Sequence, residues 1–329
     1  MITMENKMLN LSGVPYTKHP AFRRTYKQDQ LTLGLFYPIE GYTGEAPTMK
    51  DHLKIAKLAE ASGFAALWVR DVPLRDPNFG DLGQIYDPWV YLGYLASSTS
   101  LIALGTGAIV LPIRHPLHLA KAATSVDQIS NGRLLLGIAS GDRPVEFPAF
   151  GIDILDRGKL FREHFEVFKQ VTKTSFKPVQ WEGGALSGAD MVPKPFTEEI
   201  PVFVTGASQQ SMEWIAKNAH GWINYPRSPA QQRTIIQHWK TAVAQHSGDV
   251  FKPFSQSLYI DLLTDPDAEI SPIHLGYRMG RNNLILLLEE YKLIGVNHVM
   301  LSLKYSSRPA KEVIEELAEY VVPKFPAVN

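Results

Sequence analysis

Short runs of apolar residues alternate along the chain with longer segments in which apolar residues recur at helical spacing. The runs are apolar throughout, which is typical of strands buried on both faces and therefore of a parallel sheet. Eight strands are predicted within residues 31–37, 64–70, 101–112, 133–139, 200–206, 221–225, 254–263 and 297–305. Helices are predicted at residues 49–63, 88–97, 116–129, 156–171, 208–218, 229–245, 276–293 and 310–321.

Eight strand–helix units of this kind close most simply into an α/β fold of the (β/α)8 TIM-barrel type, with one barrel domain over residues 31–329. Insertions are expected after the second and fourth strands and at 172–200, where Gly and Pro are frequent and a hairpin or long loop is predicted. An open doubly wound sheet is the alternative. It usually carries a glycine-rich phosphate-binding turn after its first strand, and residues 37–41, Tyr-Pro-Ile-Glu-Gly, do not match that turn.

Residues 1–30 are polar and irregular and are predicted to form an N-terminal arm. A loosely ordered arm is the favoured interpretation. The alternative is an arm that covers one end of the barrel or a neighbouring subunit.

Composition narrows the possible functions. Lys and Arg (33) balance Asp and Glu (33) without long charged blocks, so neither nucleic acid nor an anionic membrane is expected as a partner. The absence of cysteine from the sequence excludes disulfides, thiolate metal sites and a cysteine nucleophile. His115 and His118 lie near one helix face without a carboxylate pair, so no metal site is predicted. The N-terminus does not resemble a secretion signal and no apolar stretch approaches the ~20 residues that span a bilayer, so a cytoplasmic protein is expected.

Small residues gather where the predicted strands end, which is where the active site of such a barrel lies. The exits Gly105–Gly107, Ser140–Asp142 and Thr205–Ser208 would let a flat, rigid ligand approach the backbone closely. Arg70 and Asp71 add a charge pair at the rim. Asp71 is then either an acid or base, or only the ionic partner of Arg70.

The exit at Thr205–Ser208 is the best candidate for an anion site. Gly206 turns the chain and a helix is predicted to begin near Ser208, so free backbone N–H groups and the helix dipole would favour a phosphate. The alternative is an ordinary capped helix, because serine is a common N-cap.

Several stretches resemble the luciferase-like flavin monooxygenase family, which includes bacterial luciferase and the deazaflavin (F420)-dependent oxidoreductases. The longest is residues 104–141, LGTGAIVLPIRHPLHLAKAATSVDQISNGRLLLGIASG. The others are GLFYPIEG, EASGFAALWVRD, FGIDILDRGKLFREHFEV, IPVFVTGASQQSMEWIAKNAHGWI and GVNHVMLSL. They follow one another in the order of the family from about residue 31 to residue 303.

The resemblance implies a barrel that binds reduced FMN, or F420, at the C-terminal ends of its strands. Gly107-Ala108 matches a position where the family often has a non-proline cis peptide under the flavin ring. The loop after the fifth strand matches one that holds the flavin phosphate in several relatives. The implied cofactor-binding residues are Tyr37, Thr106, Gly107, Ala108, Ser140, Gly141, Gly206, Ala207 and Ser208.

Two departures from luciferase bear on the chemistry. Where luciferase has a catalytic histidine after the acidic residue of the second strand exit, this chain has Val72. Where luciferase has Cys-Arg, it has Ala139-Ser140. Light emission with an aldehyde is therefore not expected. Arg70 and Asp71 are predicted to be catalytic, Arg70 by stabilising the anionic reduced ring and Asp71 by orienting Arg70 or transferring a proton.

The resemblance thus implies a two-component monooxygenase that acts on a small organic substrate with O2 and with reduced FMN from a separate flavin reductase, in a homo-oligomer, commonly a dimer. One alternative is F420-dependent hydride transfer on the same fold. A second is a cofactor-free lyase in which Lys304 forms a Schiff base, although such a lysine is more often a solvated charge. A third is a flavin-binding protein without turnover.

Overall fold

A closed parallel barrel forms the centre of the molecule in a computed structural model, which describes residues 14–44, 46–79 and 83–328. Its strands are β1 (Thr32–Phe36), β2 (Ala66–Val69), β3 (Ala103–Thr106), β5 (Leu134–Ala139), β8 (Val202–Thr205), β9 (Gly221–Asn224), β10 (Phe254–Leu262) and β13 (His298–Ser302). They follow this order around the barrel, which closes where β10 pairs with both β9 and β13, while β13 pairs with β1. The predicted (β/α)8 barrel is confirmed.

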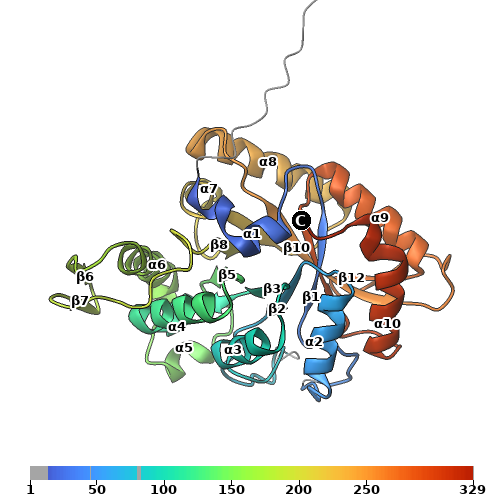
Figure 1. Ribbon diagram of the computed structural model, residues 1–329, viewed down its shortest axis with the longest axis horizontal. Coiled ribbons are helices and arrows are strands. Elements are labelled where there is room, and N and C mark those ends of the chain that lie inside the picture. Colours follow the sequence, from blue (N-terminus) through green and yellow to red (C-terminus); the bar gives the residue numbers. More distant parts are fainter. Residues whose placement is uncertain (1–13, 45, 80–82, 329) are drawn as a thin grey trace, which may run out of the picture.

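The helices lie outside the barrel (Figure 1). They are α2 (His52–Ala61), α3 (Pro88–Ser98), α4 (Pro116–Ile129), α6 (Arg157–Lys173), α7 (Met212–Asn218), α8 (Pro229–Ser247), α9 (Arg281–Ile294) and α10 (Ala310–Glu316), with the short α5 (Glu146–Ala149) before α6. In the part of the chain that is described, none of these helices is both long and apolar enough to cross a membrane.

Both faces of the strands are buried, which explains the unbroken apolar runs. Leu67 and Val69 of β2 pack in the layer between barrel and helices, whereas Ala66 and Trp68 face the barrel interior. Trp68 fits because β3 has Gly105 beside it, where a Cβ would lie 2.3 Å from the indole ring. The period-2 alternation of a strand is therefore present but hidden by two apolar environments.

A histidine inside the barrel is held neutral by its surroundings. Burial lowers the pKa of His298 to about 3. The Thr32 hydroxyl donates its proton to the Thr25 carbonyl at 2.7 Å, so it accepts from Nδ1–H of His298, also at 2.7 Å. Nε2 then accepts the Trp68 indole N–H at 2.9 Å. These buried polar groups are satisfied and need no ligand.

Residues 14–30 are ordered, so the favoured prediction of a loosely ordered arm is wrong for them. Helix α1 (Pro20–Thr25) follows a short 3-10 turn (Pro15–Lys18) and lies across one end of the barrel (Figure 1). Its Phe22, with Tyr16 and Tyr26, belongs to the interior cluster that contains Phe203. The alternative prediction of an arm that covers the barrel end therefore describes these residues, while residues 1–13 lie outside the described residues.

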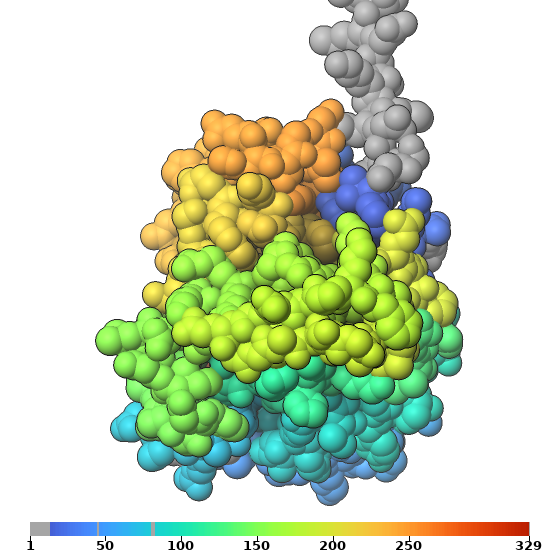
Figure 2. Space-filling view, turned by 90° about the vertical axis from the view of Figure 1, so that its left-hand side faces the viewer, coloured from blue at the N-terminus to red at the C-terminus, as the bar shows by residue number. Residues whose placement is uncertain are grey.

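A hairpin lies within the insertion predicted at residues 172–200, whereas the helix predicted from residue 276 begins later. Residues 172–200 contain the hairpin of β6 (Val179–Trp181) and β7 (Gly184–Leu186), beside α6 on the face that Figure 2 shows in green to yellow-green. The helix predicted from residue 276 begins only at Arg281. Before it, β12 (Gly276–Met279) pairs with β10 and with β11 (Ser271–Ile273).

Candidate active site

A cavity of about 380 Å³ lies at the C-terminal ends of the barrel strands. It collects residues from β1, β2, β3, β5, β8, β9, β10 and β13 or from the loops that follow them. The predicted site residues among its lining are Arg70, Asp71, Gly107, Ala108, Ser140, Gly141, Gly206, Ala207 and Ser208. The strand exits that the sequence singled out thus meet in one place.

Two predicted cofactor residues, Tyr37 and Thr106, are not in this lining. Tyr37 belongs to the outer core layer, where its hydroxyl donates to the His52 carbonyl at 3.0 Å. Its neighbour Phe36 is the residue that lines the cavity. Thr106 is fully buried, and its hydroxyl both donates to the Gly137 carbonyl (2.8 Å) and accepts from the Gly137 N–H (2.9 Å). Thr106 therefore fastens β3 to β5 instead of facing the cavity.

One side of the cavity is formed by backbone at Gly107 and Ala108, whose peptide bond is cis, as the resemblance implied. A Cβ on Gly107 would lie 3.2 Å from the Phe36 ring. The register with β5 changes across this segment: Leu104 pairs with Leu134, but Ile109 of β4 (Ile109–Val110) pairs with Ile138. The two residues form a bulge, a feature common beside active sites.

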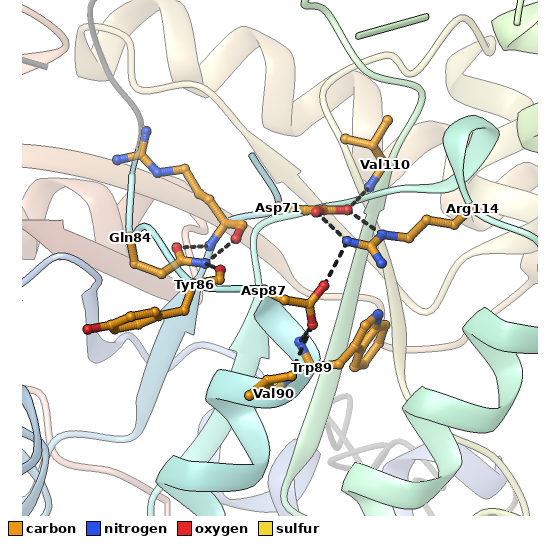
Figure 3. Close-up of polar contacts among 9 residues, drawn as sticks. Asp71, Gln84, Tyr86, Asp87, Trp89, Val90, Val110 and Arg114 are labelled. Atoms are coloured by element: carbon orange, nitrogen blue, oxygen red, sulfur yellow. Dashed lines mark hydrogen bonds and ion pairs between the residues drawn. The ribbon is translucent and has the colours of Figure 1, made fainter. Parts of the chain in front are cut away.

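Asp71 has a partner that the sequence did not indicate. Its Oδ1 accepts from Arg114 Nη2 at 2.6 Å and its Oδ2 from Arg114 Nε at 2.7 Å (Figure 3). Oδ2 also accepts from the Val110 backbone N–H at 3.1 Å. The Asp71 carboxylate is thus held by Arg114 and by the Val110 backbone, and its predicted role toward Arg70 stays a prediction.

Arg70 is held in the cavity wall by other contacts. Its backbone N–H donates to Oε1 of Gln84 at 2.9 Å, and Gln84 donates back to the Arg70 carbonyl (Figure 3). Its guanidinium carbon lies 5.1 Å from the centre of the Phe36 ring. A cation over an aromatic face is stabilised there. The Gln84 contact could not be predicted, since the sequence between residues 72 and 86 has no helix or strand pattern.

The loop after β8 forms another wall. Gly206, Ser208 and Gln209 have φ angles of 59°, 45° and 58°. Left-handed non-glycine residues of this kind cost roughly 1–3 kcal/mol each and cluster at functional sites. The Ser208 hydroxyl donates to the Thr205 carbonyl at 2.7 Å and accepts from the Ser140 N–H at 3.3 Å, joining the two exits.

No helix begins at Ser208, contrary to the prediction. Helix α7 begins at Met212, and its N-cap is Ser211, whose hydroxyl accepts from the Trp214 N–H at 3.2 Å. The argument from a helix dipole at Ser208 therefore does not hold. What remains for a ligand is the backbone of the loop and Oγ1 of Thr205, which is buried and has no hydrogen-bond partner among the described residues.

Two other candidates of the sequence lie apart from this cavity. The Lys304 ammonium lies 5.1 Å from the centre of the Tyr42 ring, and Lys304 does not line the cavity as far as the chain is described. His115 and His118 contact each other through their rings, at 5.7 Å between centroids. Within the described ranges, no group of three His, Cys, Asp or Glu residues is placed to hold a metal ion.

A buried carboxyl, Glu146, follows the cavity-lining segment in the chain and was not singled out by the sequence. It is 1% exposed, and its Oε1 has no hydrogen-bond partner within residues 14–44, 46–79 and 83–328. Burial raises its pKa to about 7, against the opposing charge of Arg143 and with a contribution from Asp71. Its neighbours Asp142 and Arg143 line the cavity.

We expect Glu146→Gln to change how stability depends on pH. A carboxyl whose pKa is raised by folding favours the folded state least when it is ionised. The destabilisation by the ionised, buried carboxylate is absent below pH 4.5, the ordinary pKa of this carboxyl. It is complete above about pH 7, where it reaches at most about 3 kcal/mol. The free energy of unfolding of the variant, minus that of the native chain, should therefore rise from pH 4.5 to pH 8. Urea unfolding across that range measures it, and a difference that does not vary with pH would contradict the burial of an ionisable Glu146.

A comparison with protein families identifies the chain. The family model described as luciferase-like monooxygenase matches residues 31–268. The chain belongs to the luciferase-like monooxygenase family. An uncharacterised Mycobacterium tuberculosis protein is 32% identical over 188 residues, which are 52% of this chain and 66% of that protein. The alkanal monooxygenase alpha chain of Photorhabdus luminescens is 26% identical over 175 residues, which are 53% of this chain and 47% of that one. The luciferase-like chain thus spans between about half and two thirds of the length of these curated relatives.

Solved structures share the fold of this luciferase-like chain. An F420-dependent secondary alcohol dehydrogenase, in complex with an F420-acetone adduct, superposes with a TM-score of 0.73 at 19% identity, covering 90% of this chain and 99% of that one. The oxygenating constituent of 3,6-diketocamphane monooxygenase from Pseudomonas putida, in complex with FMN, superposes with a TM-score of 0.70 at 15% identity, covering 91% and 99%. At these identities the likeness concerns the architecture alone.

Proposed function

We propose that the protein is a flavin-dependent oxidoreductase that binds reduced FMN in the strand-end cavity and uses O2 to oxygenate a small organic substrate, with the flavin reduced by a separate reductase. F420-dependent hydride transfer is the alternative on the same fold. The observation that carries the proposal is the cavity itself. It is walled by backbone at Gly107-Ala108 and at Gly206–Ser208, in a member of the luciferase-like monooxygenase family.

The residues present fit a flat redox ring with a polar tail. Gly107 and Ala108 offer backbone without side chains that would displace the ring, and Phe36 stands behind them. The partnerless Oγ1 of Thr205 offers a hydrogen bond to a polar ligand group beside the Gly206–Ser208 loop. When bound, reduced FMN would supply the electrons for O2 activation, and reduced F420 a hydride.

In this proposal Arg70 provides positive charge beside the ligand, and Asp71 does not transfer a proton. Arg70 lines the cavity, so its guanidinium favours an anionic reduced ring over a neutral oxidised one. Both oxygens of Asp71 are already hydrogen-bonded, which fits a structural carboxylate better than an acid or base. Apolar neighbours such as Val72, Met300 and Leu275 exclude water from part of the cavity.

Anaerobic titration with reduced FMN and with reduced F420 tests the proposal. We expect saturable 1:1 binding of reduced FMN, followed by tryptophan fluorescence, and weaker binding of F420. Tight binding of F420 alone would establish the hydride-transfer alternative. The absence of binding by either cofactor would overturn both.

Arg70→Met is expected to weaken binding of the reduced cofactor about tenfold more than binding of the oxidised form. One charge-assisted contact to the anionic ring is lost, which corresponds to about 1.4 kcal/mol. Arg233→Met is the matched control, because Arg233 is exposed on α8 and does not line the cavity. Equal weakening of both redox forms would contradict the charge role of Arg70.

A further inference from the structure

We propose that Arg114 is a positioning residue of the cofactor site, holding Asp71 against the Val110 backbone and thereby fixing the bulged segment that carries Gly107 and Ala108. The inference rests on the proposed function only for the identity of the ligand. The mechanical part concerns contacts that exist without any ligand.

The Asp71–Arg114 contact is a bidentate pair in a buried place. The Asp71 side chain is fully buried and that of Arg114 is 22% exposed. Two parallel N–H···O contacts at 2.6 and 2.7 Å match the planar fork of a guanidinium, which a lysine does not reproduce. A buried carboxylate without such a partner would be strongly unfavourable, so Asp71 depends on Arg114. In the other direction, the contacts with Asp71 raise the pKa of Arg114 despite its burial.

The pair acts on the cavity through Val110. This residue lines the cavity and follows the bulge, and its N–H donates to Oδ2 of Asp71 at 3.1 Å. On its other side, Val110 pairs with Ala139 of β5, which also lines the cavity. The bulge interrupts regular pairing between Gly105 and Ile109, so the segment needs a further anchor. Asp71, two residues after the end of β2, provides that anchor.

Arg114 also reaches a third element. Its Nη2 lies 3.3 Å from Oδ2 of Asp87, the N-cap of α3, whose other oxygen accepts from the Trp89 and Val90 N–H groups (Figure 3). One guanidinium therefore ties the end of β2 to the start of α3. It thus holds both ends of the loop that begins at Arg70 and contains Gln84.

The mechanical part is tested by amide hydrogen exchange of the unliganded protein. In Arg114→Met, peptides covering residues 107–112 should exchange at least tenfold faster than in the native chain. Arg114→Lys should restore part of the protection, and Arg233→Met should leave it unchanged. Protection in Arg114→Met equal to that of the native chain would overturn the proposal, whether or not a cofactor binds. If Arg114→Met does not fold, Arg114→Lys is compared with the native chain instead. Faster exchange of residues 107–112 than in the native chain is expected, and equal protection would overturn the proposal.

The functional part is tested by cofactor affinity in a double-mutant cycle, with whichever of the two cofactors the native chain binds. Arg114→Met and Asp71→Asn should each weaken binding at least tenfold, and the double variant should be no weaker than the worse single one, because Arg114 acts through Asp71.

The outcomes distinguish a failure of the proposed function from a failure of the positioning role of Arg114. Native protein that binds neither cofactor disproves the proposed function while the exchange experiment still decides the role of Arg114. Native protein that binds a cofactor, with Arg114→Met binding equally well, disproves the positioning role alone. Additive losses in the double variant would mean that Arg114 acts independently of Asp71 and would also overturn it.

Discussion

Gly137→Ala is expected to lower the free energy of unfolding by about 4 kcal/mol or to prevent folding. A Cβ at this position would lie 1.9 Å from the Thr106 carbonyl oxygen and 3.0 Å from its carbonyl carbon, and neither is the end of a flexible side chain. Overpacking of a core costs typically 1–3 kcal/mol, and sometimes more. Separating the strands would also break the two hydrogen bonds that the Thr106 hydroxyl makes with Gly137, at about 1 kcal/mol each. Urea unfolding of the purified variant measures the loss.

Gly93→Ala is the matched control. Gly93 lies within α3, where the nearest atom to an added Cβ is Cδ1 of Ile129 at an ordinary 3.9 Å. Alanine in a helix interior is favoured over glycine by up to about 1 kcal/mol, so this variant should be as stable as the native chain or slightly more stable. A Gly137→Ala protein with a native unfolding midpoint would show that β3 and β5 do not approach each other as closely as described.

The barrel could be predicted because both strand faces are buried, and that same property hides which face points inward. Leu35 and Tyr37 face the helices, whereas Phe36 faces the cavity, yet all three are large and apolar. Along a strand, neighbouring side chains point to opposite faces, but this alternation does not show which of the two faces lies inside the barrel. Phe36, and not the predicted Tyr37, therefore lines the cavity.

Elements without an apolar run of their own were the ones that prediction missed. Residues 276–279 have no apolar run and form β12 only because β10 and β11 offer pairing edges. Helix α1 is ordered by contacts of Phe22 with Phe203, which is on another strand. Local patterns do not contain such contacts.

The same limit applies to charge partners. Arg70 and Asp71 are adjacent in the sequence, and a pair between them was one of the alternatives predicted for Asp71. The structure adds a partner that lies 43 residues later, Arg114. The arginine in the stretch VLPIRHP is evident in the sequence, but only the structure shows that it binds the carboxylate of the residue that follows the end of β2, Asp71. The meeting of the strand exits was easier to predict, because closure of the barrel brings the strand ends together regardless of their side chains.

Ala139→Phe is expected to weaken binding of the reduced cofactor at least 100-fold while leaving the fold intact. Ala139 is the last residue of β5 and lines the cavity, so a phenyl ring there fills space that the ligand needs and does not enter the packed core. A 100-fold loss corresponds to about 2.7 kcal/mol of binding free energy. The same titration that tests the native chain measures it, and circular dichroism with thermal unfolding verifies the fold.

Ala185→Phe is the matched control, because Ala185 is exposed in the β6–β7 hairpin and carries the same change away from the cavity. A second cavity, of about 300 Å³, lies between the N-terminal segment and α8, with Trp239 and Lys252 in its wall. If the cofactor bound there, Ala139→Phe would bind like Ala185→Phe, and the strand-end cavity would lose its role. Weakened binding in Ala139→Phe alone would support binding in the strand-end cavity and not in the second one, since the two cavities share no residue.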